Sequence, residues 1–460
     1  ANLGLILKDL GKLKEAELYT REAIKLNPGL ATAYSNLGVI LTDLGKLKEA
    51  ELFQRKAIKL NPNFANAYAN LGLILKDLGK LKEAELCQRK AITLNPDLAT
   101  AHSNLGAILK NLGKLKEAEK SMLKSIELNS DLAKAYFSLS ILNYSNNSLW
   151  KEKLFSESIL KNKSQTDQVD IYFARANILH KDKSYKDSSK YLLLANNLKL
   201  NIFPSNSEDL IKKSKLLFSE SNKYKVNKVN KVNKDFPLSI FIVGFPRCGS
   251  TLVESILTMN LNVNDLGEIN LLEESFLEQR KANHSLNLAE LYWGKAKKIT
   301  NELKISTNKW LYNYQYTGII AKNIPNTKII HCFRHPLDNI LSIYRANFAM
   351  GNQYSSSLVD CARVYLDQEK VMTGYKKRFR SKIYDLNYDT LVSNPDKEIK
   401  SLISWLGWNW QDQYLSPHLN PRSVSTASSV QVRSPINSQS ISGWKNYKEM
   451  LKPAMEIITQ

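Results

Sequence analysis

The chain has 460 residues, of which 43% are hydrophobic and 24% charged, with a formal net charge of +21. The length allows two or three folded domains, and no run approaches the ~20 apolar residues that a membrane helix needs. The lysines are spread along exposed helical positions without interleaved aromatics, so the charge favours a general lysine bias over a nucleic-acid surface.

The cysteines have no paired spacing; they are Cys87, Cys248, Cys332 and Cys361. This favours a reducing compartment, and we therefore expect a cytoplasmic protein without a disulfide framework or a zinc site. The six histidines form no ligand pattern, so no metal is expected. No signal peptide opens the chain. Its first residues, "ANLGLILKDLG", fall inside a repeat, so we expect the natural protein to begin upstream, with a targeting signal left open.

The first 200 residues are a repeat array. Glycines recur every 34 residues, at Gly4, Gly38, Gly72 and Gly106. This is the period of the tetratricopeptide repeat, and the contents resemble that family, with Ala50, Ala57 and Pro62 at signature positions. Small residues let two antiparallel helices approach closely, and stacking buries their apolar faces. We predict four clear repeats in 1–132 and two degenerate ones in 133–200.

One polar position recurs with the same period, at Asn2, Asn36, Asn70 and Asn104. It falls on the first helix of each pair, which lines the concave groove of such arrays. A row of asparagines can donate to and accept from the amides of an extended peptide, which makes a protein or peptide a candidate partner. Recent repeat duplication would copy asparagines without any function, and the sequence leaves both interpretations open.

Residues 201–236 are rich in Asn, Ser and Lys and end in "KVNKVNKVNK", which predicts a solvated linker. After it the pattern changes to alternating strands and helices. We predict strands at 238–244, 327–333 and 382–388, followed by helices at 250–260, 337–350 and 389–406. Strands separated by helices favour a parallel sheet, so we predict an α/β domain over 237–460 with ligand at the carboxyl ends of its strands.

The turn after the first strand reads "GFPRCGST", residues 244–251. It resembles a phosphate-binding loop, but Ser250 stands where a nucleoside triphosphatase has lysine. Backbone N–H groups from Arg247 to Thr251, through Cys248 and Gly249, can surround an anion at the positive end of the next helix. Any strand-to-helix turn can carry glycine and serine, so the loop alone leaves the question open.

A second element strengthens this interpretation. In "CFRHPLDNILSIY", Arg334 ends a strand and Ser342 follows eight residues later, two turns into a helix, so both can meet one phosphate. Here the residues resemble the sulfotransferase family. The resemblance implies that the first loop holds the 5′ end of 3′-phosphoadenosine 5′-phosphosulfate, and that Arg334 and Ser342 hold its 3′-phosphate.

The resemblance is closer to tyrosylprotein sulfotransferases and to bacterial sulfotransferases fused to tetratricopeptide repeats. It implies that Glu268 in "LGEINLL" is the general base and that Lys309 faces the transferred sulfuryl group. It also implies that Arg247, Lys309 and Ser428 offset the charge that grows on the bridging oxygen of the leaving nucleotide. It also implies that Tyr388 contacts the nucleotide and that Ser428 opens a C-terminal lid over 428–447. Four of these residues have an ordinary structural alternative. Glu268 could be a solvated glutamate, and Lys309 could be one lysine among many. Tyr388 could pack under the sheet, and Ser428 could be one serine of a serine-rich loop.

Three positions depart from the family pattern. Gly443 stands where a basic residue usually precedes the lid tryptophan, Ala346 stands where another basic residue is common, and Cys248 replaces a serine. We expect a sulfotransferase without a metal whose acceptor is a protein tyrosine, a glycan or a small molecule. A repeat scaffold with a degenerate sulfotransferase domain and a P-loop kinase stay open as alternatives.

Overall fold

The computed structural model describes residues 2–142, 149–223, 236–283, 285–300, 304–348 and 351–459. Its internal contacts divide the chain into two compact units. The repeat unit contains Ala1–Ile178 and the later segment Arg422–Val430, and the sheet unit contains Leu179–Pro421 and Gln431–Gln460. Within the described ranges, no helix is both long enough and apolar enough to cross a membrane.

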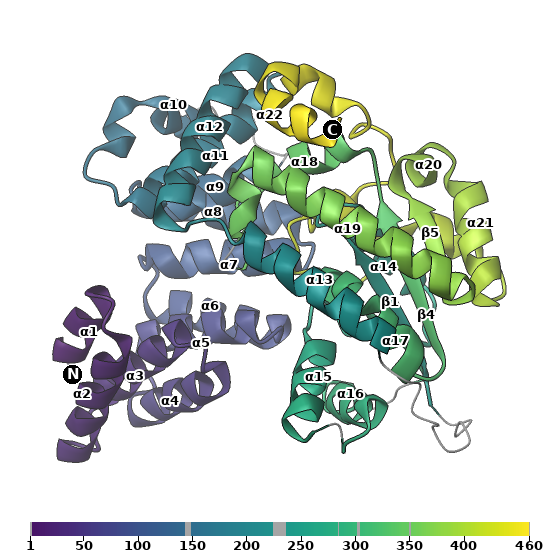
Figure 1. Ribbon diagram of the computed structural model, residues 1–460. Helices are drawn as coiled ribbons and strands as arrows, with labels where there is room; N and C mark the ends of the chain where they lie inside the picture. The colour runs from purple at the N-terminus through teal and green to yellow at the C-terminus, as the bar shows by residue number, and fades with distance from the viewer. Residues whose placement is uncertain are drawn as a thin grey trace. The chain divides into compact units, whose positions relative to one another are not determined.

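The repeat unit is built from successive helix pairs (Figure 1). The first four pairs are α1 (Asn2–Asp9) with α2 (Leu13–Leu26), α3 (Ala31–Asp43) with α4 (Leu47–Leu60), α5 (Ala65–Asp77) with α6 (Leu81–Leu94), and α7 (Ala99–Asn111) with α8 (Leu115–Leu128). They are followed by α9 (Ala133–Ile141), α10 (Leu149–Phe155) and α11 (Gln165–Lys181). The four clear repeats predicted from the sequence are therefore confirmed as helix pairs.

Small residues set the close packing within each pair. A Cβ on Gly38 would lie 2.6 Å from Nε2 of Gln54, so any larger residue would require the Gln54 side chain to shift. Gln54 itself donates to the backbone oxygen of Ser35 at 2.8 Å and ties the second helix to the first. Ala50 and Ala57 are fully buried on the same second helix. The residues that define the repeat are thus the ones that determine the distance between its helices.

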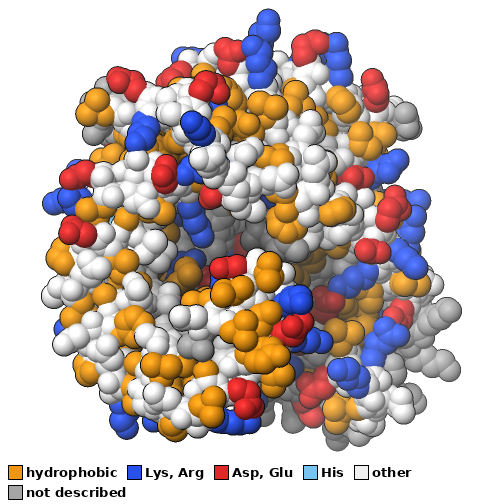
Figure 2. Space-filling view, turned by 90° about the vertical axis from the view of Figure 1, so that its left-hand side faces the viewer, with side chains coloured by type: hydrophobic (Ala, Val, Ile, Leu, Met, Phe, Trp, Pro, Cys, Tyr) orange, Lys and Arg blue, Asp and Glu red, His pale blue; other side chains and the backbone are white. Residues whose placement is uncertain are grey.

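Charged side chains are interspersed over the surface that Figure 2 shows, with lysine and arginine among aspartate and glutamate. Ion pairs link neighbouring repeats in the repeat unit. The Glu51 carboxylate accepts from Arg55 at 2.7 Å and from Lys80 of the next repeat at 3.0 Å. Part of the excess of lysine therefore serves contacts between repeats.

The sheet unit contains one five-stranded parallel sheet with the order β2-β3-β1-β4-β5. Its strands are β1 (Leu238–Gly244), β2 (Val263–Asp265), β3 (Ile305–Asn308), β4 (Thr327–Phe333) and β5 (Ile383–Asn387). The three strands predicted from the sequence are confirmed as β1, β4 and β5. The short strands β2 and β3 were not predicted, because three or four residues carry too little alternation to be recognised.

Helices cover both faces of this sheet (Figure 1). One face packs Phe241 and Val243 into a core with α13, α15, α16, α17 and α19, and the other packs Ile240 and Ile242 against α14, α20 and α21. The helices of the unit are α12 (Tyr185–Ile202), α13 (Ser207–Lys223), α14 (Ser250–Leu257), α15 (Leu271–Lys281), α16 (Leu288–Ala296), α17 (Thr317–Asn323), α18 (Pro336–Tyr344), α19 (Leu358–Phe379), α20 (Tyr388–Ser393), α21 (Pro395–Leu406) and α22 (Lys448–Ile458). The expected α/β architecture is confirmed.

The structure corrects the predicted linker over 201–236. Residues 207–223 form α13, a helix of the sheet unit whose Leu217 lies in the main core. The backbone oxygen of Ser221 accepts from Lys322 at 2.8 Å. The prediction was wrong because the segment is polar in composition, although its apolar residues recur at helical spacing and pack against the core of the sheet unit. The repetitive "KVNKVNKVNK" lies outside the described residues, and the two compact units differ from the predicted ranges 1–200 and 237–460.

Candidate functional site

The turn between β1 and α14 wraps tightly around the start of the helix. Arg247 (φ +67°) and Gly249 (φ +94°) have left-handed backbones, and α14 begins directly afterwards at Ser250. Cys248 points into the core, while Ser250 and Thr251 are buried at the helix start. This turn therefore presents its backbone and the Arg247 side chain at the carboxyl end of the sheet.

Tyr388 lies directly against this turn. A Cβ on Gly249 would stand 2.3 Å from the Tyr388 Cδ2, so the ring covers the glycine at van der Waals distance. The same ring also contacts a cation, because the Arg334 Cζ lies 4.7 Å from the ring centroid. The Tyr388 hydroxyl shares a 2.9 Å hydrogen bond with the Ser440 hydroxyl. The predicted residues Gly249, Tyr388 and Arg334 thus meet in space.

Two guanidinium groups stand close together here. Arg247 donates from Nε to the Ser342 hydroxyl at 3.2 Å and from Nη2 to Oε1 of Gln431 at 2.7 Å. Arg334 is buried and donates to the backbone oxygen of Ser440 at 2.7 Å. Burial, and then the neighbouring charge of Arg334, lowers the pKa of Arg247 to about 10. The positive charge of Arg334 thus disfavours a second positive charge on Arg247.

Lys309 and Glu268 meet at the end of β3. The chain at Glu268 runs beside this strand end, since Leu266 N donates to the Thr307 oxygen at 2.9 Å and Lys309 N to the Gly267 oxygen at 3.0 Å. The fully buried Lys309 ammonium then lies 2.5 Å from the Glu268 Oε1, and the Glu268 side chain is 44% exposed. A buried cation thus holds a carboxylate that solvent can reach.

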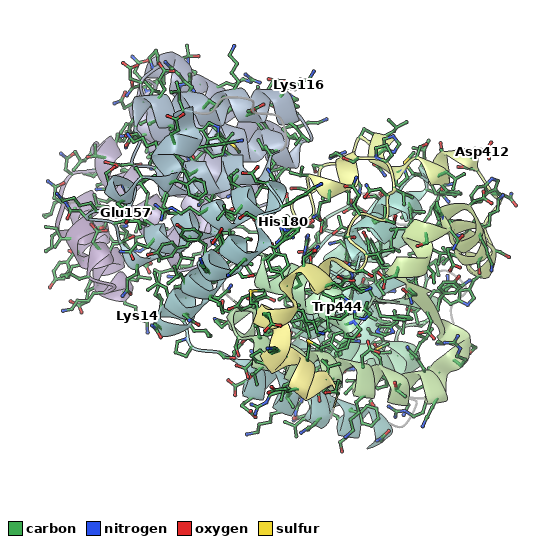
Figure 3. All side chains as sticks on the ribbon, turned by 90° about the horizontal axis from the view of Figure 1, so that it is seen from above. Lys14, Lys116, Glu157, His180, Asp412 and Trp444 are labelled. Carbon is green, nitrogen blue, oxygen red and sulfur yellow. The ribbon has the colours of Figure 1, made fainter. Side chains whose placement is uncertain are left out.

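The C-terminal segment 431–447 packs against the same edge of the sheet unit. The buried Asp338 carboxylate accepts from the backbone N–H of Ser442 at 2.8 Å and of Trp444 at 2.9 Å. The Trp444 ring stacks on His335 at 5.5 Å between centroids, and Figure 3 labels this tryptophan on the yellow C-terminal part of the chain. A carboxylate therefore anchors the turn at Gly443.

The remaining predicted residues lie in the repeat unit. Ser428 belongs to the segment 422–430, which packs with the repeats: Val424 N donates to the Asn111 oxygen at 2.9 Å. Its role at a nucleotide stays a prediction. In the asparagine row, Asn2 is exposed and Asn36, Asn70 and Asn104 are half-buried. The Asn70 side chain donates to the Ser35 hydroxyl at 3.3 Å.

Several residues of this site were missed in the sequence. Glu254 is buried on α14 with its Oε2 3.8 Å from the Lys309 ammonium, and Asp338 and Ser440 anchor the C-terminal segment. Glu254 lies one turn after the phosphate-loop pattern, at a position of the helix that faces the core. A carboxylate at a core-facing position was the signal in the sequence that could have identified this residue.

The chain matches two families. Residues 1–30, 31–64, 65–98 and 99–132 match the tetratricopeptide repeat, and residues 279–412 match the sulfotransferase family. The second match includes Lys309, Arg334, Ser342 and Tyr388, while the loop at 244–251 and Glu268 precede it.

Two relatives and one solved structure cover about half of the chain. An uncharacterized protein of Aquifex aeolicus is 29% identical over 244 residues, 48% of this chain and 32% of its own length. A putative protein-tyrosine sulfotransferase of Caenorhabditis briggsae is 23% identical over 242 residues, 46% of this chain and 81% of its own. The chain thus spans about a third of the Aquifex relative. A sulfotransferase domain from the curacin biosynthetic pathway is 19% identical with a TM-score of 0.35, covering 49% of this chain and 97% of that one.

Proposed function

Because this chain joins tetratricopeptide repeats to a domain of the sulfotransferase family, we propose that it transfers a sulfuryl group from 3′-phosphoadenosine 5′-phosphosulfate to an acceptor hydroxyl. The observation that carries the proposal is the contact of Tyr388 with both Gly249 of the turn and the Arg334 guanidinium at the carboxyl end of the parallel sheet. Ligands of open α/β sheets bind at this edge.

The residues present fit such a donor. The backbone around Gly249 and the hydroxyls of Ser250 and Thr251 stand at a helix N-terminus, which favours the 5′-phosphosulfate. Arg334 and Ser342 would hold the 3′-phosphate. The Arg334 Nε, buried without a hydrogen-bond partner among the described residues, is a donor that a phosphate oxygen could satisfy.

The chemistry assigned to the remaining residues follows from their contact. Glu268 takes the proton of the acceptor hydroxyl while the acceptor oxygen forms its bond to sulfur and the bond from sulfur to the bridging phosphate oxygen breaks. Lys309 and Arg247 offset the charge that grows on that bridging oxygen. A positioned general base accelerates a reaction typically by about 10²–10⁴-fold. We expect Glu268→Ala to abolish transfer and to leave nucleotide affinity nearly unchanged, as measured by turnover and by calorimetry.

Calorimetric titration tests the donor site. 3′-Phosphoadenosine 5′-phosphate, the product of the donor, should bind, whereas ATP should bind far more weakly because it lacks the 3′-phosphate. Preferential binding of ATP with magnesium would favour a P-loop kinase. Absence of binding for both nucleotides would favour a repeat scaffold with a degenerate sulfotransferase domain, and in either case the proposal fails.

A protein tyrosine is the acceptor that we propose first. The name of the Caenorhabditis briggsae relative supports it, as does a repeat array able to hold an extended peptide. Incubation with labelled donor and a cell extract, followed by identification of the labelled product, distinguishes a tyrosine from a glycan or a small molecule. The triple variant Asn36→Ala, Asn70→Ala and Asn104→Ala should weaken peptide binding, and unchanged binding would exclude the asparagine row.

A further inference from the structure

A second carboxylate lies behind the Lys309 ammonium. Glu254 projects from α14 toward β3 and is 1% exposed. Its Oε2 lies 3.8 Å from the Lys309 Nζ, and its Oε1 accepts from the Thr307 hydroxyl at 3.4 Å. Lys309 is itself fully buried and therefore stands between two carboxylates, Glu268 toward solvent and Glu254 toward the core.

Such an arrangement needs a physical reason, because a buried carboxylate is unfavourable unless it is paired. One ammonium between two carboxylates has a net charge of −1. When Glu268 takes up a proton, the net charge of the three groups becomes zero, and the ammonium still has an ionised partner. Without Glu254, protonation of Glu268 would leave Lys309 as a buried cation with no anionic partner among these three groups.

We propose that Glu254 is a positioning residue that holds the Lys309 ammonium in place while Glu268 takes the proton of the acceptor hydroxyl. This inference rests on the proposed sulfuryl transfer. Glu254 touches neither the acceptor nor the donor in this scheme and acts through Lys309. It also lies on the helix that begins at the anion loop, so it couples the position of the lysine to that loop.

The test is Glu254→Gln, which keeps the size of the side chain and removes its charge. The value of kcat should fall by about 10- to 100-fold, since small misplacements of a catalytic group have effects of this size. The KM for the donor and the affinity for 3′-phosphoadenosine 5′-phosphate should stay within about threefold, because no nucleotide contact is lost. Glu254→Asp, which restores the charge, should recover part of the rate.

Two comparisons separate positioning from a general loss of stability. Glu273→Gln removes another half-buried ion pair of the sheet unit, with Lys213, and should leave kcat unchanged. In a Lys309→Met background, Glu254→Gln should have little further effect on kcat, because the group through which it acts is gone. An equal fall of kcat in both backgrounds would overturn the inference even for a folded variant.

The outcomes distinguish this inference from the proposed function. A wild-type chain that neither binds 3′-phosphoadenosine 5′-phosphate nor transfers a sulfuryl group overturns the proposed function and the inference with it. A wild-type chain that is active, with Glu254→Gln equally active, overturns the inference alone.

Discussion

Replacing Gly249 by alanine tests the packing of Tyr388 over the turn between β1 and α14. The backbone of Gly249 has φ +94°, and an added Cβ would lie 2.3 Å from the Tyr388 Cδ2 and 3.0 Å from its Cγ. Left-handed backbone costs a residue with a Cβ about 1–2 kcal/mol. Displacing a packed ring costs about 1–3 kcal/mol more. Alanine also lowers the conformational entropy of the unfolded chain, which offsets about 0.4–1 kcal/mol of this loss of stability. We expect a net loss of about 1–5 kcal/mol in the free energy of unfolding.

Gly407 provides a matched control. It also has a left-handed backbone (φ +77°), but a Cβ there meets no atom within 4 Å. Gly407→Ala should therefore lose only the backbone contribution, at most about 1–2 kcal/mol. The double variant Gly249→Ala with Tyr388→Ala removes the ring, so the effect of the alanine in that background should approach that of Gly407→Ala.

Urea unfolding followed by tryptophan fluorescence measures these differences, and calorimetry with 3′-phosphoadenosine 5′-phosphate measures the consequence at the site. Gly249→Ala should weaken nucleotide binding while Gly407→Ala leaves it unchanged. If the two glycine variants lose the same free energy of unfolding, the Tyr388 ring does not press on Gly249 and the reasoning is refuted.

Three further predictions concern the sheet unit. Arg334→Ala should weaken binding of 3′-phosphoadenosine 5′-phosphate by about 10- to 100-fold, since a hydrogen bond to a charged group contributes about 1.5–3 kcal/mol. If calorimetry gives the variant the same affinity as the wild type, Arg334 does not bind the nucleotide. Burial lowers the pKa of His180 to about 3, so only the unfolded chain gains its proton as pH falls below about 6.5. Acid should therefore destabilise the wild type relative to His180→Gln by at most about 1.4 kcal/mol per pH unit. A difference in the free energy of unfolding that stays constant from pH 7 to 4 would contradict this. Asp338→Asn keeps only one of the two oxygens that accept hydrogen bonds from the C-terminal segment. It should increase the rate of trypsin cleavage at the exposed Lys445 several-fold. An unchanged cleavage rate would indicate that these hydrogen bonds do not hold the segment.

The sequence was most informative where a pattern is local and repeated. The 34-residue period identifies the helix pairs, because each pair needs the same small residues at the same close contacts. The run before Gly244 identifies β1, and the turn with Arg247 identifies the start of α14. It was least informative over 207–223, where a polar composition hid a helix that only its neighbours stabilise.

The sequence by itself therefore determined the two architectures, the strand, turn and helix that carry Arg247 and Gly249, and the candidate residues on them. Only the tertiary structure decided which side chains meet. Glu254, Glu268 and Lys309 come from three separate segments, and they are brought together because β3 lies between β1 and β2 in the sheet. That strand order depends on packing across the whole unit, and no spacing in the chain encodes it.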